Sequence, residues 1–306
     1  VPIKTDYLKE FADDFVWMLE GTVNCLNAHM LTTFEVIENE NIDSVMTGFF
    51  GDILAGSGTW IYSLGVLGGT NDEKIFGEQY SVHCDIMKDE DIQKYVRRDL
   101  QGKVLHSARN GLWNRYLQST SKNRYFKSRY FSMHERQRRY TSFNLYVFDH
   151  KNVLAPFLDH EFVNYVLHIP STLLIHQNLY SSVIANNLPS LARIPYNETR
   201  LPIHASKWRR GLQWRWEKWN KHKCVQATLG RNWKKRNDNY IRSADAIRNG
   251  SKEYVVDHIN SCPMVHDVFN KTEIDHMIQN HLSGKSNEQL RILALLTLAL
   301  WHKHFH

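Results

Sequence analysis

The sequence predicts an α/β protein that is mostly α-helical over the residues present. A short apolar run, Asn41–Met46, ends abruptly in Thr47–Gly48 and indicates a buried strand that leads into a glycine-containing loop. Apolar side chains recur at helical spacing along Leu8–Leu26 and again in many later segments. Strand signals largely stop beyond Lys74, so we expect helices to form most of the remaining chain.

Helical periodicity gives the expected helices in chain order. Acidic residues near Asp89 favour a helix start there, because they interact favourably with the helix dipole. Pro170 is expected to end a helix, since proline disfavours helical backbone at the residue before it. The predicted helices are Leu8–Leu26, Leu31–Glu38, Asp89–Leu100, Val104–Leu117, Tyr125–Phe148, His160–His168, Leu173–Asn187 and Glu288–His302.

Composition and cysteine usage are those of an ordinary globular protein. Of 306 residues, 42% are hydrophobic and 23% are charged, and no apolar run is long enough to span a bilayer. The four cysteines are far apart and form no C-x-x-C pair, which argues against zinc ribbons and favours a reducing, cytoplasmic setting. Val1–Glu10 lacks the pattern of a signal peptide, and because it does not begin with methionine, an upstream portion stays possible.

The loop after the predicted strand contains the residue types that hold ATP phosphates. Such a loop needs glycines that let phosphates approach the backbone, and a carboxylate that holds Mg²⁺. Gly48, Gly51 and Asp52 meet these needs in kind. A glycine-rich turn after a strand is also ordinary turn chemistry, so the loop on its own leaves both interpretations open.

A second segment, Ala155–Phe162, reads APFLDHEF and continues to Pro170. It contains an extended turn with a proline, followed by an amphipathic helix that a second proline ends. Asp159 stands at the start of this helix, where a carboxylate accepts a hydrogen bond from a free backbone N–H group. We therefore interpret Asp159 as the N-cap of the helix rather than as a catalytic residue.

Together, the two segments resemble the synthetase domain of the asparagine synthase family. That domain carries S-G-E-G-A-D-E-L-F-G-G-Y and, later, E-x-R-x-P-F-L-D-x-x-L-V-x-x-A-x-x-L-P. The first motif is similar to Thr47–Gly58, and the second is nearly intact over Pro156–Pro170. Leu295–Trp301 also resembles the closing helix of the family, so the resemblance covers essentially the whole chain.

This resemblance implies an adenine-nucleotide α-hydrolase-like, Rossmann-like fold and an ATP-dependent, AMP-forming amide ligase or amidotransferase. It implies ATP and Mg²⁺ as cofactors, with an unidentified carboxylate or amine as substrate. Thr47, Gly48 and Gly51 would line the nucleotide site, and Asp52 would hold the metal. Residues 1–70 would be the C-terminal part of the nucleotide-binding core, and residues 71–306 the helical remainder.

Several positions depart from the motifs of the family. The family's S-G-G-x-D-S pyrophosphate loop does not occur in this sequence, so it would lie upstream or be lost. Charged residues of the family's motifs fall on Phe49, Ile53, Asn152, Leu154 and Glu198. A catalytically lapsed homologue that acts as a binding or scaffold module is therefore the alternative to an active ligase, and we assign no catalytic residue.

Positive charge gathers in a basic, tryptophan-rich segment, residues 204–242. Between Leu201 and Gly250 there are 13 Lys and Arg and 3 acids, a local +10, which leaves −4 for the rest of a chain of net charge +6. Such a segment can be a solvated face whose tryptophans pack onto the core, or it can bind a polyanion. For Trp208–Arg242 we place an anionic membrane surface or lipid-linked substrate ahead of nucleic acid.

Overall fold

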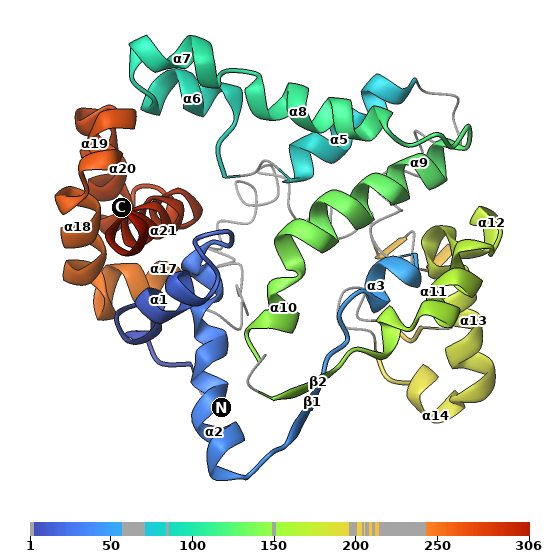
Figure 1. Cartoon of the computed structure of the whole chain (residues 1–306). Coiled ribbons are helices and arrows are strands. Elements are labelled where there is room, and N and C mark those ends of the chain that lie inside the picture. Colours follow the sequence, from blue (N-terminus) through green and yellow to red (C-terminus); the bar gives the residue numbers. More distant parts are fainter. Residues whose placement is uncertain are drawn as a thin grey trace.

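The computed structural model confirms a mostly helical chain with a small parallel sheet (Figure 1). It describes residues 3–56, 71–83, 86–148, 151–195, 201–203, 205, 208–209, 212–213 and 243–306. Within these residues, no helix is long and apolar enough to cross a membrane.

The sheet consists of two short parallel strands from distant parts of the sequence. Strand β1 (Ser44–Met46) pairs with β2 (Asn152–Leu154), and Val45 lies opposite Val153. The first strand was predicted, but its predicted burial is wrong, because the side chain of Met46 is 72% exposed. The second strand was not predicted, since three residues are too few to produce a clear alternating pattern.

The main hydrophobic core joins the beginning of the described chain to its end. Helix α1 (Tyr7–Met18) and the 3₁₀ helix η1 (Cys25–Thr33) pack against α21 (Gln289–Phe305). Polar contacts tie the same elements together, since the Cys25 amide donates to the Thr297 hydroxyl over 2.9 Å. The remaining helices of this layer are α17 (Ser243–Asp245), the π-helical turn η5 (Ala246–Gly250), α18 (Lys252–Ser261), α19 (Pro263–Val268) and α20 (Lys271–Leu282).

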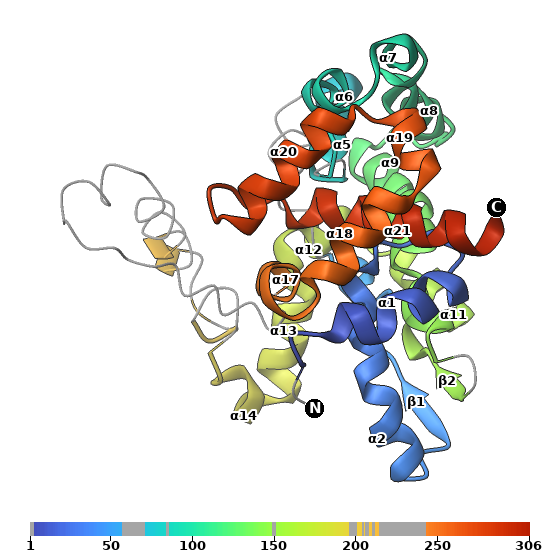
Figure 2. The same cartoon turned by 90° about the vertical axis from the view of Figure 1, so that its left-hand side faces the viewer.

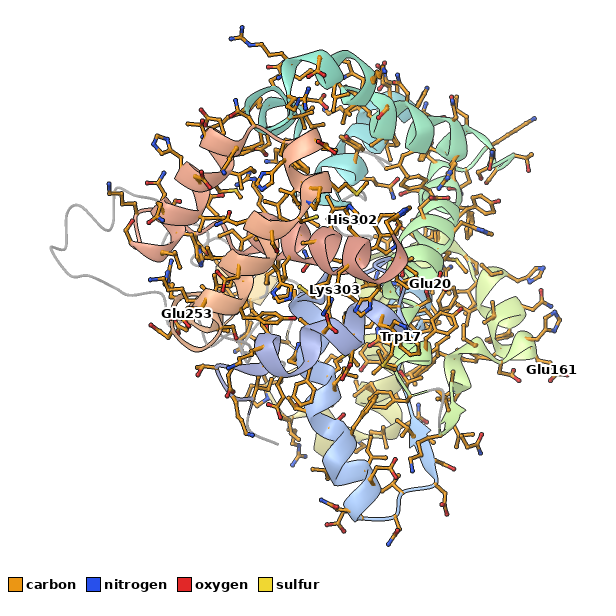
Figure 3. The ribbon with its side chains drawn as sticks, turned by 60° about the vertical axis from the view of Figure 1, so that its left-hand side comes forward. Trp17, Glu20, Glu161, Glu253, His302 and Lys303 are labelled. Carbon is orange, nitrogen blue, oxygen red and sulfur yellow. The ribbon has the colours of Figure 1, made fainter. Side chains whose placement is uncertain are left out.

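An ion pair links two helices at the outer surface of this layer. Lys303 Nζ lies 2.8 Å from Asp13 Oδ1 and links α21 to α1. Figure 3 shows Lys303 and His302 of α21 beside Trp17 and Glu20, which lie at the end of α1. Figure 2 shows α18, α21 and α1 side by side, and the three helices pack on one another.

The first predicted helix, Leu8–Leu26, is wrong beyond Met18. The chain turns at Glu20 and Gly21, whose φ angles of 51° and 64° lie in the left-handed region. A Cβ atom at position 21 would also lie 2.9 Å from the Trp301 ring, so glycine is required there. The following helix, α2 (Phe34–Asn39), begins three residues later than predicted.

The helices between Asp72 and Leu117 lie along the top of the molecule in Figure 1. Helices α6 (Asp89–Tyr95) and α7 (Arg98–Val104) replace the single helix predicted over Asp89–Leu100. The break occurs because Val96 leaves the helix and forms an isolated antiparallel bridge with Phe269. Two neighbouring helices, α5 (Asp72–His83) and α8 (Ser107–Leu117), pack against each other.

The long helix predicted over Tyr125–Phe148 is confirmed in its main features. It consists of α9 (Arg124–Phe131), a π-helical stretch η2 (Ser132–Thr141) and α10 (Phe143–Tyr146), which follow one another through the middle of the molecule (Figure 1). A hydrophobic cluster of Phe76, Tyr116 and Phe131 packs α9 against α5 and α8.

A helical layer follows the second strand. Predicted helix His160–His168 is confirmed as α11 (His160–Leu167), and Leu173–Asn187 is divided among shorter helices. These are α12 (Ser171–Leu174), η4 (Ile175–Gln177), α13 (Asn178–Asn187) and α14 (Pro189–Ala192). Leu54 and Tyr125 pack with Leu174 in a second hydrophobic cluster, which holds this layer against the loop after β1.

Candidate functional site

The parallel pairing of the two strands brings the two sequence motifs together. The chain leaves β1 through the loop at Thr47 and then forms the short helix α3 (Gly51–Leu54). It leaves β2 at the same edge of the sheet and forms the 3₁₀ turn η3 (Pro156–Leu158). The Thr47 amide donates to the Leu154 carbonyl over 2.9 Å, so the ladder continues into the first residue of the loop. Ligands of open α/β sheets bind at this carboxyl edge.

Gly51 is the closest contact between the two motifs. A Cβ atom built at this position would lie 2.8 Å from Cδ2 of Phe157, closer than real Cβ atoms approach a ring. Gly51 therefore permits η3 to pack directly on α3. In sequence terms, a glycine of the first motif faces the phenylalanine of the P-F-L-D segment.

Asp52 extends from α3 and is exposed. Its Oδ1 atom accepts hydrogen bonds from the Ile53 amide, over 2.7 Å, and from Nε2 of Gln137, over 3.4 Å. The Thr141 hydroxyl donates to Oε1 of Gln137 over 2.7 Å, which orients the Gln137 amide so that its nitrogen faces Asp52. Among the described residues, hydrogen bonds reach only the Oδ1 atom of this carboxylate, so its Oδ2 atom is available to a ligand.

A divalent cation would find one ligand here rather than a complete protein site. Among the described residues, no group of three or more His, Cys, Asp or Glu side chains is arranged to hold a metal ion. Mg²⁺ is commonly bound by one or two carboxylates together with water and substrate phosphates. Asp52 fits that mode of binding, in which the phosphates supply most of the ligands.

Thr47 and Gly48 form the backbone turn that precedes α3. The Thr47 hydroxyl accepts a hydrogen bond from the Phe49 amide over 3.2 Å, which fixes the turn. No atom of the described residues lies within 4 Å of a Cβ built at Gly48, so the backbone there is open to a ligand. The next turn residue, Phe50, has φ 74° in the left-handed region, which glycine adopts freely and phenylalanine rarely.

Asp159 has the structural role that the sequence predicts. Its side chain accepts a hydrogen bond from the Phe162 amide over 2.8 Å and caps the first turn of α11. The carboxylate is therefore occupied in holding the helix start.

The described residues at the departing motif positions do not form an alternative charged site. Ile53 is 5% exposed and belongs to the core. The Phe49 and Phe50 rings pack against each other with centroids 5.7 Å apart. Asn152 donates to the Ser44 hydroxyl over 3.5 Å across the sheet. Glu198 lies outside the described residues.

Two residues of the long central helix face the loop and were missed by the sequence analysis. Gln137 reaches Asp52, and Nη2 of Arg129 donates to the Leu54 carbonyl over 3.3 Å. The Arg129 side chain is 2% exposed, and burial lowers its pKa. Within the described part of the chain, no acceptor bonds to its Nε or Nη1 atom. Arg129 and Gln137 are eight residues apart in the sequence, which is about two helical turns. This spacing is the signal that would have placed both side chains on one face of the predicted helix.

The basic segment 204–242 falls mostly outside the described residues. Of its described side chains, Trp208 is 71% exposed and Leu212 is 45% exposed. Both side chains are exposed and available to a partner.

Comparisons with known proteins agree with the two motifs. The model of the asparagine synthase family matches residues 4–303, which is nearly the whole chain. No curated protein and no solved structure matches it significantly. The family match spans both motifs, the strands that align them and the closing helix α21. The chain therefore belongs to the asparagine synthase family.

Proposed function

We propose that this protein contributes the carboxyl edge of a nucleotide site to an ATP-dependent, AMP-forming amide ligase or amidotransferase. Thr47, Gly48 and Gly51 would line the bound nucleotide, and Asp52 would hold Mg²⁺. The acceptor would be a carboxylate or amine compound whose identity the sequence does not specify. Family membership supports the general reaction class.

One observation carries the proposal. The β1–β2 pairing places the loop of the first motif beside the P-F-L-D segment at the carboxyl edge of a parallel sheet. Among the residues that the structure describes, none crowds the Gly48 backbone, and hydrogen bonds hold the exposed Asp52 carboxylate through one oxygen only. This arrangement suits a phosphate chain and its cation, since phosphates need close approach to the backbone and Mg²⁺ needs oxygen ligands.

The proposed reaction has two steps. A substrate carboxylate oxygen attacks the α-phosphorus of ATP, the bond to the bridging oxygen breaks, and pyrophosphate leaves with an acyl-adenylate formed. An amine nitrogen then attacks the acyl carbon, AMP leaves with the bonding electrons, and the nitrogen loses a proton to give the amide. Mg²⁺ would supply neutralising charge for the phosphates when bound. Asp52 would orient that charge, while Gln137 fixes the Asp52 carboxylate.

We also propose that the chain has the adenine-nucleotide α-hydrolase-like fold. In this proposal residues 1–70 belong to the nucleotide-binding core and residues 71–306 form its helical remainder. The parallel direction of β1 and β2 supports it, because strands of nucleotide-binding α/β sheets run parallel. A cytoplasmic setting remains part of the proposal, based on the four scattered cysteines.

The alternative function, a lapsed homologue that binds without catalysis, has a specific observation in its favour. Ile53 occupies an acidic position of the family's motif and is buried in the core, so it contributes no charge to the site. Leu154, at a position where the motif has arginine, is 43% exposed and equally uncharged. A protein of this kind would bind ATP or a partner but release no pyrophosphate.

The test compares two exposed aspartates on either side of β1, Asp52 in α3 and Asp43 next to the start of the strand. Asp52→Ala and the control Asp43→Ala remove the same charge, one after β1 and one before it. We expect ATP to bind the wild type more tightly with Mg²⁺ than with a chelator, and Asp52→Ala to lose that difference. Pyrophosphate release from ATP, assayed with a panel of carboxylic acids and ammonia, should be abolished in Asp52→Ala and kept in Asp43→Ala.

Each result separates the alternatives. Unchanged pyrophosphate release in Asp52→Ala would remove Asp52 from the site. Magnesium-dependent ATP binding without pyrophosphate release in the wild type would favour the lapsed homologue. Circular dichroism of both variants establishes that the fold is intact, which is expected because both side chains are exposed.

For the basic segment we propose contact with an anionic membrane surface or a lipid-linked substrate at Trp208–Arg242. The local charge of +10 and the exposed Trp208 support this partner. Binding to vesicles that contain anionic phospholipid should weaken steeply as ionic strength rises. Vesicle binding that does not depend on ionic strength would argue against a membrane partner. Stronger binding to single-stranded nucleic acid than to vesicles would argue against it as well.

A further inference from the structure

A cavity of about 400 Å³ lies between α5 and α8, away from the strand ends. Figure 1 shows α5 and α8 on the far side of α9 from α3 and the sheet. Its volume is within the range of small-molecule sites. The lining residues are Glu73, Phe76, His106, Arg109, Asn110 and Trp113.

One wall of this cavity is aromatic and held rigidly. The Trp113 ring stacks on the Tyr116 ring, with centroids 5.6 Å apart and an angle of 9° between the planes. Phe76 packs against Trp113 at 5.0 Å and is 1% exposed. Because Trp113 is fixed from behind by buried rings, its remaining surface offers a flat apolar platform without a large loss of side-chain entropy on binding.

Three polar side chains of the cavity, Glu73, Arg109 and Asn110, have no hydrogen-bond or ion-pair partner among the described residues. Glu73, on α5, and Arg109, on α8, form no ion pair or side-chain hydrogen bond with another described residue. The side-chain amide of Asn110 likewise has no described partner. A carboxylate and a guanidinium that line one cavity without pairing are available to a ligand that carries both opposite charges.

His106 adds a further sign of a built site. Its φ angle of 64° lies in the left-handed region, and its Nδ1 atom lies 3.1 Å from Oδ2 of Asp89. Non-glycine residues in this conformation are uncommon and concentrate at binding and catalytic sites. Among the lining residues, the charges of Glu73 and Arg109 cancel each other, so these two residues together add no net charge to the cavity.

We propose that this cavity binds a free amino acid with an aromatic or large aliphatic side chain. Arg109 pairs with the ligand's carboxylate, Glu73 with its ammonium group, and Trp113 packs against its side chain. Phosphate-bearing ligands are disfavoured, because the Glu73 carboxylate repels a multiply charged anion. The site lies apart from the proposed ligase site, and its occupancy does not depend on that reaction.

The test uses three small probes on the whole chain. L-Phenylalanine carries both charges, phenylacetate lacks the ammonium group, and 2-phenylethylamine lacks the carboxylate. Binding is measured by saturation-transfer NMR and by titration at millimolar concentrations. We expect L-phenylalanine to bind at least about tenfold more tightly than either single-charge probe, since each lost charge-assisted hydrogen bond weakens binding by about that factor.

Variants assign each charge to its residue. Arg109→Gln should remove the preference for L-phenylalanine over 2-phenylethylamine, and Glu73→Gln the preference over phenylacetate. Lys74→Gln, an exposed charge on α5 next to Glu73, is the matched control and should change nothing. The proposal would be overturned if all three probes bound equally or if L-phenylalanine did not bind. It would also be overturned if Lys74→Gln changed the probe preferences as much as Glu73→Gln does.

Discussion

Gly51 lies against the ring of Phe157, and this contact joins the two motifs of the chain. Because a Cβ atom at position 51 would stand 2.8 Å from Cδ2 of Phe157, Gly51→Ala must push η3 away from α3. Overpacking of this kind destabilises proteins by about 1–3 kcal/mol. We expect a loss of that size in the free energy of unfolding, measured by urea denaturation.

Two comparisons establish that the clash is the cause. Gly48→Ala, where the new Cβ meets no atom of the described residues within 4 Å, should lower the free energy of unfolding much less. In the double variant Gly51→Ala/Phe157→Ala, part of the loss from Gly51→Ala should disappear, which a double-mutant cycle measures as a coupling energy. Equal losses from the two glycine substitutions would show that Phe157 does not restrict position 51.

Gln137 is expected to act on the metal site through Asp52. Its Nε2 atom donates to Asp52 Oδ1, and the Thr141 hydroxyl holds the other end of the amide. Partners that orient a metal ligand contribute about 10–100-fold to metal affinity. Gln137→Leu should therefore weaken the magnesium-dependent part of ATP binding by about tenfold. Titration of ATP with and without Mg²⁺ measures this effect.

A graded control separates orientation from packing at the same position. Thr141→Val keeps Gln137 but releases its amide, so its effect on magnesium-dependent binding should be in the same direction and smaller. Gln93→Leu makes the same chemical change at an exposed position and should have no effect. If Gln137→Leu lowers only the free energy of unfolding and leaves magnesium dependence intact, Gln137 is a packing residue.

The sequence predicted the local parts of the site but not their assembly. The loop at Thr47–Gly48 and the cap at Asp159 were predicted, because a strand end and a helix start leave signals within a few residues. The three-residue strand β2 left no periodic signal, so the pairing that aligns the motifs was not predicted. Contacts such as Gly51 with Phe157 depend on this pairing across about a hundred residues, which local propensity does not encode.

Helix ends were the other source of error, and each has a particular cause. The break after Met18 follows from the left-handed residues Glu20 and Gly21, and only the second is a common helix stop. The helix predicted over Asp89–Leu100 is divided in two because Val96 forms a bridge with Phe269, which is a tertiary contact. Tertiary contacts override weak helix propensity, so these ends are decided by packing rather than by sequence pattern.

His281 is expected to make stability depend on pH. It is 0% exposed, and burial, with a further contribution from the charge of Arg248, lowers its pKa. Its Nδ1 atom accepts a hydrogen bond from the Glu288 amide over 3.0 Å, which requires the neutral ring. The unfolded chain therefore binds a proton more readily, at an ordinary histidine pKa of about 6.5. Stability from this group is complete above that pH and is lost as pH falls below it.

The variant His281→Asn tests the pH dependence of the free energy of unfolding. The Asn side chain can offer an acceptor near the position of Nδ1 but has no proton to gain in this range. We expect the rise in the free energy of unfolding between about pH 5 and 7 to be smaller in His281→Asn. His276→Asn, at an exposed histidine of the same helix, should keep the wild-type slope. A slope unchanged in His281→Asn would assign the pH dependence to other groups.

Arg291 connects α21 to α6 and is expected to be the most important charged residue for stability in that region. Its Nη2 atom lies 2.8 Å from Oδ2 of Asp91, and its Nη1 atom lies 2.5 Å from Oε2 of Glu288. Burial alone would lower the pKa of Arg291, but the hydrogen bonds and charges of the two carboxylates outweigh burial and raise it. The three side chains are 16–23% exposed, so water screens these pairs only in part.

Removal of the guanidinium would leave two carboxylates close together without a cation. We expect Arg291→Met to lower the free energy of unfolding by about 2 kcal/mol, since hydrogen bonds to charged groups contribute about 1.5–3 kcal/mol. Arg291→Lys should recover only part of this, because an ammonium group lacks the planar fork that reaches both partners. Arg97→Met, which breaks the Arg97–Asp99 pair at 45% and 60% exposure, should cost less than about 1 kcal/mol. If Arg291→Met costs no more than Arg97→Met in urea denaturation, the pairs of Arg291 are screened like an ordinary surface pair and do not hold α21 to α6.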